Sequence, residues 1–203
     1  MKTCITIFYI AAITLALSAC QGRVEPQADM KMTDEELVKK GKYLMVIGAC
    51  HDCHSPKVLT HEGPMPDTTR LLSGHPKDEK NVAIPPDSEE WILFNKNLTS
   101  FVGPWGVSFA ANLTPHETGT KYWTLEQFKT ALRKGKYKGL ENSRDLLPPM
   151  PWQMYRNMTD DDLLAIYTYL RSIKPIDNRV PDPILKGAPA DMSSDRATAE
   201  IKK

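Results

Sequence analysis

Two cysteines and two histidines stand within five consecutive positions, Cys50-His51-Asp52-Cys53-His54. Sulfur and imidazole groups this close together suit three kinds of chemistry: a zinc ion, a redox-active dithiol, or a haem bound covalently through both sulfurs. Each kind of site makes a different demand on the rest of the chain. The remaining sequence therefore has to distinguish among the three.

A structural zinc ion normally takes four protein ligands, so a second pair of cysteines or histidines would be needed. The remaining histidines are single and widely spaced: His61, His75 and His116. A thioredoxin-like dithiol would follow a β-strand at the start of a helix, within an α/β pattern. Here the motif follows a helical segment, and alternating strand patterns are scarce. We therefore favour neither zinc nor a dithiol.

The spacing Cys-x-x-Cys-His is typical of covalent haem attachment. Cys50 and Cys53 would each add to one vinyl group of a haem c, which gives two thioethers. His54 would then face the iron as its proximal ligand. His51, which stands between the cysteines, would be a spacer residue at the haem edge.

A sixth iron ligand is expected from the sequence Leu-Pro-Pro-Met-Pro-Trp, in which Met150 lies between Pro149 and Pro151. Proline fixes its own φ and keeps the preceding residue extended, so this stretch forms a stiff, non-helical loop. Such a loop can hold a thioether sulfur towards iron with little conformational entropy left to lose. Thioether ligation favours ferrous iron and predicts a moderately high reduction potential. The long connection before residue 122 offers three other candidates: Met65, His75 and His116.

The N-terminus predicts export and a lipid anchor. Lys2 precedes an apolar stretch that is too short for a comfortable membrane span. Cys20 follows Leu-Ser-Ala, which resembles the lipobox of bacterial lipoproteins; an ordinary secretory signal is the alternative. We expect residues 1–19 to be a signal peptide, Cys20 to carry the lipid, and residues 20–32 to tether the domain. The protein would then lie on the periplasmic or cell-surface side of a bacterial membrane.

The cysteine count agrees with export. Cys4 leaves with the signal and Cys20 takes the lipid, so only Cys50 and Cys53 remain and no disulfide framework can form. The 203 residues include 26 basic and 25 acidic side chains, and basic and aromatic residues do not cluster. We therefore expect no nucleic-acid partner.

Three helices are predicted by one repeated start signal. A threonine N-cap is followed three residues later by Glu, Gln or Asp, with apolar residues before the cap and at the fourth helical position. Gly41 lies on the apolar stripe of the first helix, where it permits a close helix crossing. The predicted helices cover residues 34–47, 125–134 and 160–172, and their caps are Thr33, Thr124 and Thr159.

Residues 55–122 show little periodicity, and only Ser88–Leu98 suggests a short helix. A structureless connection of this length is usually functional or wraps around something large. The last residues, 182–203, are rich in proline and charge, and we expect a disordered tail.

The capped first helix, Cys-His-Asp-Cys-His, the later Pro-Pro-Met-Pro-Trp and the closing helix together resemble a class I c-type cytochrome. The stretch from Phe109 to Trp152 is similar to single-haem domains of cytochrome subunits that serve periplasmic dehydrogenases. The resemblance covers residues 33–181. It implies an all-α class I cytochrome c fold, here with a long irregular insertion between the haem motif and the second main helix.

The same resemblance implies that Asn112 and Trp123 lie near the haem propionates; for Trp123, a role as the hydrophobic staple of the second helix is the alternative. The chain departs from the pattern in its long insertion. It also has one Cys-x-x-Cys-His motif where several dehydrogenase subunits have three.

The sequence thus predicts an electron carrier and not an enzyme. It would be a lipid-anchored cytochrome with one haem c, whose iron is held by His54 and Met150 and exchanges electrons with redox proteins. Those partners would be a dehydrogenase, an oxidase or another cytochrome. Two alternatives stay open: an electron-accepting subunit of a periplasmic dehydrogenase complex, or a haem enzyme or sensor with a labile sixth ligand.

Overall fold

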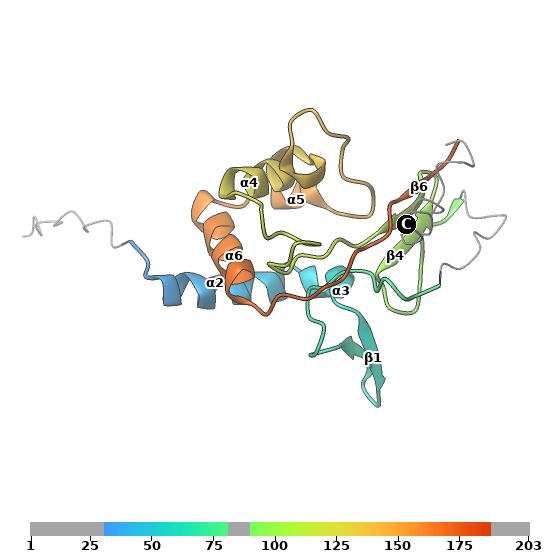
Figure 1. Cartoon of the computed structure of the whole chain (residues 1–203), viewed down its shortest axis with the longest axis horizontal. Coiled ribbons are helices and arrows are strands. Elements are labelled where there is room, and N and C mark those ends of the chain that lie inside the picture. Colours follow the sequence, from blue (N-terminus) through green and yellow to red (C-terminus); the bar gives the residue numbers. More distant parts are fainter. Residues whose placement is uncertain (1–30, 81–89, 188–203) are drawn as a thin grey trace, which may run out of the picture. The chain divides into compact units, whose positions relative to one another are not determined.

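The computed structural model describes residues 31–80 and 90–187 (Figure 1). The chain divides into two units, Met1–Met32 and Thr33–Lys203, and we describe the second. The predicted signal peptide and Cys20 lie outside the described residues. Among the residues described, no helix is both long enough and apolar enough to span a bilayer.

The helices of the described chain include three main ones and three short ones. The main helices are α2 (Asp34–Ile47), α4 (Leu125–Lys134) and α6 (Asp160–Ser172), at the bounds that the sequence predicts. In each, the N-cap threonine hydroxyl accepts from the N3 amide while the N3 side chain accepts from the cap amide. These capping contacts involve neighbouring residues only, which explains why sequence locates the helices well. The short helices are α3 (Cys50–His54), α5 (Trp152–Tyr155) and the 3-10 turn η3 (Tyr137–Gly139).

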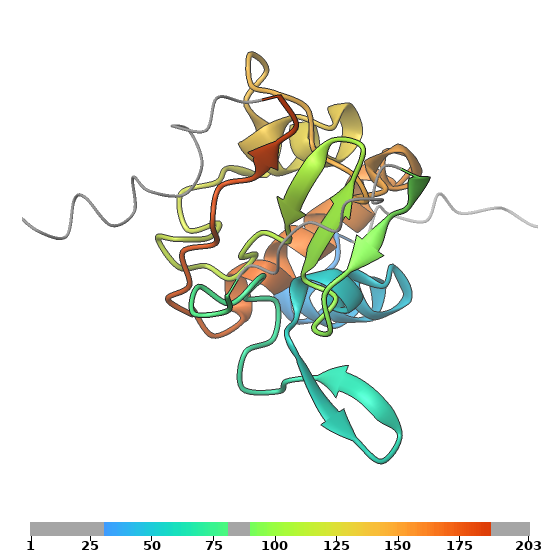
Figure 2. The same ribbon diagram turned by 90° about the vertical axis from the view of Figure 1, so that its right-hand side faces the viewer.

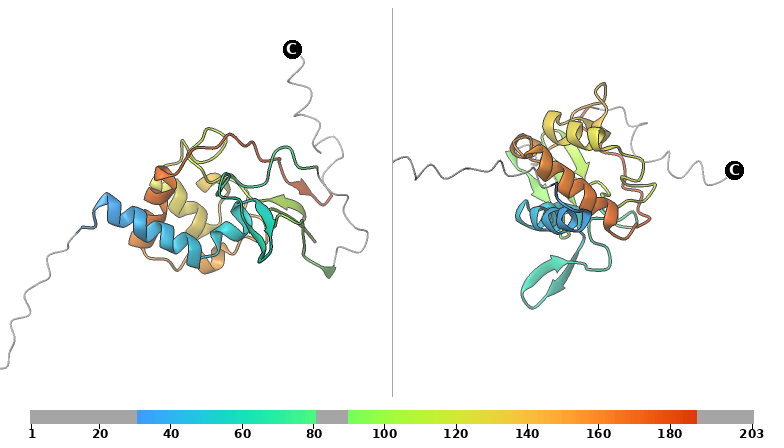
Figure 3. Two further views of the ribbon diagram at one scale, coloured as in Figure 1. Left: turned by 90° about the horizontal axis from the view of Figure 1, so that it is seen from below. Right: turned by 90° about the vertical axis from the view of Figure 1, so that its left-hand side faces the viewer.

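Helices α2 and α6 cross closely, as predicted (Figures 1 and 3). Gly41 makes this possible, because a Cβ at that position would overlap the Ala165 carbonyl and the Tyr169 Cβ. An ion pair between Lys40 and Asp162, 2.7 Å apart, also joins the two helices. The core around the crossing consists of buried apolar side chains from several elements: Met45, Leu72, Phe128, Leu163, Ile166, Tyr169 and Leu170.

Most of the regular structure is helical, but the predictions of an all-α fold and of an irregular insertion are wrong, because the insertion, together with Ile184–Leu185, forms two small antiparallel sheets. The first is a hairpin of β1 (Lys57–Thr60) and β2 (Gly63–Pro66), which extends away from the helices (Figures 1 and 2). The second has the order β3-β4-β5-β6. Its strands are β3 (Leu93–Phe94), β4 (Ser100–Gly103), β5 (Gly106–Phe109) and β6 (Ile184–Leu185). Strands of two to four residues are too short to show a reliable alternation in sequence.

The expected helix at Ser88–Leu98 is likewise a strand and a turn over its described part. The Asn95 side chain explains this, because its Oδ1 accepts hydrogen bonds from the amides of Thr99 and Ser100, at 2.8 and 3.1 Å. Asparagine that bonds to nearby amides favours a turn over a helix. At the other end of the chain, the described part of the expected tail joins the second sheet through β6. Residues 188–203 lie outside the described residues.

Candidate functional site

The motif Cys50–His54 folds as helix α3, which begins immediately after Ala49 in a left-handed conformation with φ of 55°. Both cysteines are free and half-buried. Burial raises the pKa of the Cys50 thiol to about 11 and also raises that of Cys53. Reactive dithiols are instead favoured by a lowered thiol pKa, so this environment does not favour disulfide exchange.

His54 is buried, and its ring is held by one hydrogen bond. Nδ1 lies 2.8 Å from the carbonyl oxygen of Ala111. Because a carbonyl oxygen only accepts, Nδ1 must carry the proton and Nε2 is left with a free lone pair. Burial also lowers the pKa of His54, which favours the neutral ring. This is the tautomer and charge state that a metal-ligating imidazole requires.

A second segment of chain, the turn at residue 74, bonds to the backbone of the same histidine. The Gly74 amide donates to the His54 carbonyl at 2.8 Å, and the next amide, His75, donates to the Ala110 carbonyl at 2.9 Å. His51 is engaged locally instead, with Nδ1 2.9 Å from the Ser55 hydroxyl. The backbone of residues 110–111 and the turn at residue 74 therefore both support His54.

Lys57 closes the C-terminal end of α3, a role that the sequence analysis missed. Its Nζ donates to the carbonyls of His51, Asp52 and Ser55 at 3.0, 2.8 and 2.6 Å. A cation there bonds to the last carbonyls of the helix and interacts favourably with the helix dipole. Partial burial lowers the pKa of Lys57.

Met150 is half-buried in a turn and its loop is tied down on two sides. On one side, the Ser108 hydroxyl of β5 donates to the Pro148 carbonyl at 2.6 Å. On the other side, the Tyr155 hydroxyl of α5 donates to the Gly48 carbonyl at 2.6 Å, two residues before Cys50. Burial raises the pKa of Tyr155 to about 12, which keeps this donor protonated. The methionine segment is thus brought to the haem motif, while its ligation of iron stays a prediction.

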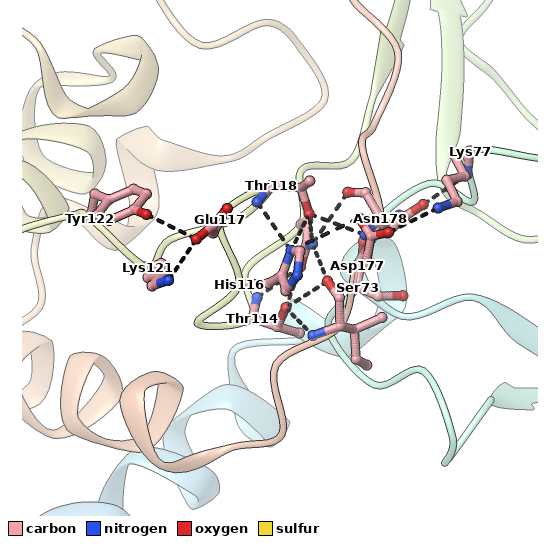
Figure 4. A network of polar contacts seen from close by, with 12 residues as sticks. Ser73, Lys77, Thr114, His116, Glu117, Thr118, Lys121, Tyr122, Asp177 and Asn178 are labelled. Atoms are coloured by element: carbon pink, nitrogen blue, oxygen red, sulfur yellow. Dashed lines mark hydrogen bonds and ion pairs between the residues drawn. The ribbon is translucent and has the colours of Figure 1, made fainter. Parts of the chain in front are cut away.

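The other candidate ligands lie in different surroundings. Met65 is exposed on the projecting β1–β2 hairpin. His116 has its Nδ1 2.9 Å from the Thr118 hydroxyl, within the polar network of Figure 4. His75 is 1% exposed, with Nδ1 3.0 Å from Thr99 Oγ1 and no partner for Nε2 among the described residues. His75 is therefore the main alternative to Met150 as the predicted sixth ligand of the iron.

Asn112 and Trp123, expected near the propionates, both make internal contacts. The Asn112 amide group donates to the carbonyl of Ile176 at 2.9 Å and to the Thr118 hydroxyl at 3.2 Å. It thereby ties its segment to the chain that follows α6, beside the Thr114 and Asn178 contacts shown in Figure 4. Trp123 packs against the helical core. Their place beside a propionate stays a prediction.

Sequence reasoning also missed the β4–β5 hairpin, which carries Trp105 and Ser108. The signal was present in the sequence, because two short runs rich in valine and phenylalanine flank Gly-Pro-Trp-Gly at residues 103–106. Such runs around a glycine-containing turn are typical of a hairpin.

The chain is similar to cytochrome subunits of several dehydrogenases. It is 28% identical over 153 residues to the cytochrome c subunit of alcohol dehydrogenase (quinone) from Gluconobacter oxydans, covering 73% of this chain and 24% of that protein. It is 26% identical over 182 residues to the gluconate 2-dehydrogenase cytochrome c subunit of Pantoea cypripedii, covering 86% and 32%. The fructose dehydrogenase cytochrome subunit of Gluconobacter japonicus is 38% identical over 82 residues, covering 39% and 16%. No family model matches the chain.

These similarities support a c-type cytochrome domain with covalently bound haem c, which transfers electrons. The chain spans less than a third of the length of each of these three relatives. The residues of this chain fit such a group. Two half-buried thiols stand beside a buried histidine whose Nδ1 is hydrogen-bonded and whose Nε2 makes no hydrogen bond within the described part of the chain.

Proposed function

We propose that this chain is a single-haem, electron-accepting subunit of a dehydrogenase complex. The observation that carries the proposal is the His54–Ala111 hydrogen bond, which leaves Nε2 free, in a chain whose relatives are named as dehydrogenase cytochrome subunits. The sequence alone favours an independent carrier, with the subunit as the alternative. The comparisons favour the subunit.

In this proposal Cys50 and Cys53 would hold the haem through thioethers, and His54 Nε2 and Met150 Sγ would bind its iron. The haem would supply reversible one-electron transfer. The chain's own part is to hold His54 neutral and oriented through Ala111, and to present the methionine from a stiff loop. Because the protein would supply both of these ligands, no position at the iron would be left for a substrate.

A lipid on Cys20 would keep the subunit at the membrane surface. Replacing Cys20 with serine should move the protein from the membrane fraction to the soluble fraction. Membrane association that persists in the Cys20→Ser variant would contradict the anchor.

The ligation is tested by the ferric absorbance spectrum of the purified protein. We expect a weak near-infrared sulfur-to-iron band that disappears in Met150→Ala and persists in His75→Asn, which keeps a polar partner for Thr99. A low-spin wild type without this band would contradict ligation by Met150, and a change to high spin in His75→Asn but not in Met150→Ala would assign the sixth ligand to His75. A high-spin wild type that binds carbon monoxide readily when reduced would favour the sensor or enzyme alternative.

The subunit assignment is tested by isolating the protein from its native membranes in mild detergent. We expect it to co-elute with a dehydrogenase, and its haem to become reduced when a substrate of that enzyme is added. Alcohols, gluconate and fructose are the first compounds to try, given the names of the relatives. A protein that elutes without a dehydrogenase, and whose haem none of these compounds reduces, would indicate an independent carrier.

A further inference from the structure

One segment of chain, from β5 to Ala111, forms hydrogen bonds both to His54 and to the loop that carries Met150, the two proposed iron ligands. At its end, the Ala111 carbonyl accepts the hydrogen bond from His54. Three residues earlier, Ser108 donates to Pro148, two residues before Met150. The partners are distant in sequence, by 57 and 40 positions, so only the folded chain brings them together.

The hydrogen bond from Ser108 has a defined direction. Trp105 Nε1 lies 3.2 Å from Ser108 Oγ, and an indole N–H can only donate. The Pro148 carbonyl can only accept, so the Ser108 proton must point at Pro148. Ser108 is buried, which excludes water as a competing partner and strengthens the bond. Trp105, Ser108 and Pro148 therefore form a short relay with one polarity.

The strand that carries this relay is itself fixed. β5 pairs with β4 on one side and with β6 on the other, and the Lys186 amide donates to the Trp105 carbonyl at 3.0 Å. The Trp105 ring lies directly over Gly103, where a Cβ would overlap it. The indole donor is thus held on both its backbone and its ring.

Because the Pro148 carbonyl is held in place, the short, stiff loop that follows it also restricts the position of Met150. Pro149 and Pro151 restrict the backbone on either side of Met150, and the Met150 amide donates to the Leu147 carbonyl at 3.3 Å. Few backbone torsions then separate the anchored carbonyl from the sulfur-bearing residue.

We propose that Ser108, oriented by Trp105, is a positioning residue that holds the Met150 loop for iron ligation. The proposal rests on the proposed ligation by His54 and Met150. The sheet that sequence reasoning missed thereby has a function in the site: β5 holds the Pro148 carbonyl through Ser108, and the chain that follows β5 holds His54 through Ala111.

The test uses the haem-loaded full chain and measures how readily imidazole displaces the sixth ligand from ferric iron, together with the near-infrared band. Ser108→Ala should weaken the band and bind imidazole roughly three- to tenfold more tightly, as expected for loss of one buried hydrogen bond. Ser108→Thr keeps the hydroxyl and should restore wild-type affinity. Trp105→Phe keeps an aromatic side chain but removes the indole N–H that orients Ser108, and it should shift the imidazole affinity in the same direction as Ser108→Ala.

The matched control is Ser100→Ala, in the neighbouring strand, whose hydroxyl makes no hydrogen bond among the described residues; it should bind imidazole as the wild type does. Met150→Ala shows the result expected when the sixth ligand is lost completely, with no near-infrared band and the tightest imidazole binding. If Ser108→Ala equals the wild type while Met150→Ala loses the band, the positioning role is overturned and the ligation stands. If Met150→Ala does not change the band, both the ligation and the positioning role are overturned.

Discussion

The two sides of the proposed iron site are built in different ways. On the histidine side, a short motif places the ligand: the cysteines and His54 share one helical turn, which Lys57 closes with three hydrogen bonds, and distant Ala111 only orients the ring. On the methionine side, distant contacts place the ligand itself, because Met150 lies in a half-buried loop that Ser108 and Tyr155 anchor. A short motif can therefore encode the position of His54, whereas its orientation and the position of Met150 need the complete fold.

The helices and the second sheet also differ in what a mutation in each should affect. Helices α2 and α6 form the crossing that supports the core, and mutations there should destabilise the whole domain. The second sheet supports the methionine loop, and damage there should loosen the sixth ligand first. The predictions below separate these two outcomes.

The largest effect is expected from removing the proximal ligand. His54→Ala should lose the low-spin ferric spectrum entirely, because no other group in α3 has a buried, oriented Nε2. His51→Ala, in the same helical turn, is the control and should keep the wild-type spectrum. A low-spin spectrum retained by His54→Ala and lost by His51→Ala would reverse the assignment of the two histidines.

A large loss of stability is expected from Gly41→Ala in the α2–α6 crossing. The new methyl group would overlap the Ala165 carbonyl, and the net destabilisation should be about 2 kcal/mol after the gain in helix propensity. Urea denaturation measures it. Lys42→Ala, at an exposed neighbouring position, should change the free energy of unfolding by less than about 0.5 kcal/mol. Equal stability of the two variants would mean that the helices do not cross closely.

A smaller and more selective effect is expected from Phe101→Leu in β4. Phe101 is buried against the edge of the exposed Phe94 ring, so its truncation should cost about 1 kcal/mol. Imidazole should then displace the sixth ligand more easily while the far-ultraviolet circular dichroism of the helices stays unchanged. Phe94→Leu is the matched control with little expected effect. Loss of helical signal in Phe101→Leu would contradict the separation between sheet and helical frame.

The smallest effect is expected from the ion pair that joins α2 to α6. The hydrogen bond from Lys40 holds the pKa of Asp162 below its ordinary value. A lowered carboxyl pKa adds stability that is present above about pH 4 and is lost as pH falls below it. Asp162→Asn should therefore reduce the acid dependence of stability, by less than about 1 kcal/mol. The same dependence in Asp162→Asn as in the wild type would exclude this pair as its source, and Asp161→Asn serves as control.

The sequence predicted the parts of the fold that short-range contacts determine. The three main helices appear at their expected bounds because the capping boxes at Thr33, Thr124 and Thr159 involve residues three positions apart. It missed both sheets, because strands of two to four residues show no reliable alternation even where they pair as local hairpins, and β6 pairs with β5 from far along the chain. Ser108 illustrates the same limit in the site: a serine in a run of valine and phenylalanine has no local feature that points to Pro148.

The most direct test of the central claim is a crystal structure of the haem-loaded chain. We predict iron coordinated by His54 Nε2 and Met150 Sγ, with the His54–Ala111 and Ser108–Pro148 hydrogen bonds both intact. Iron coordinated by His75, or a Met150 side chain turned away from the haem while Ser108 still bonds to Pro148, would contradict it.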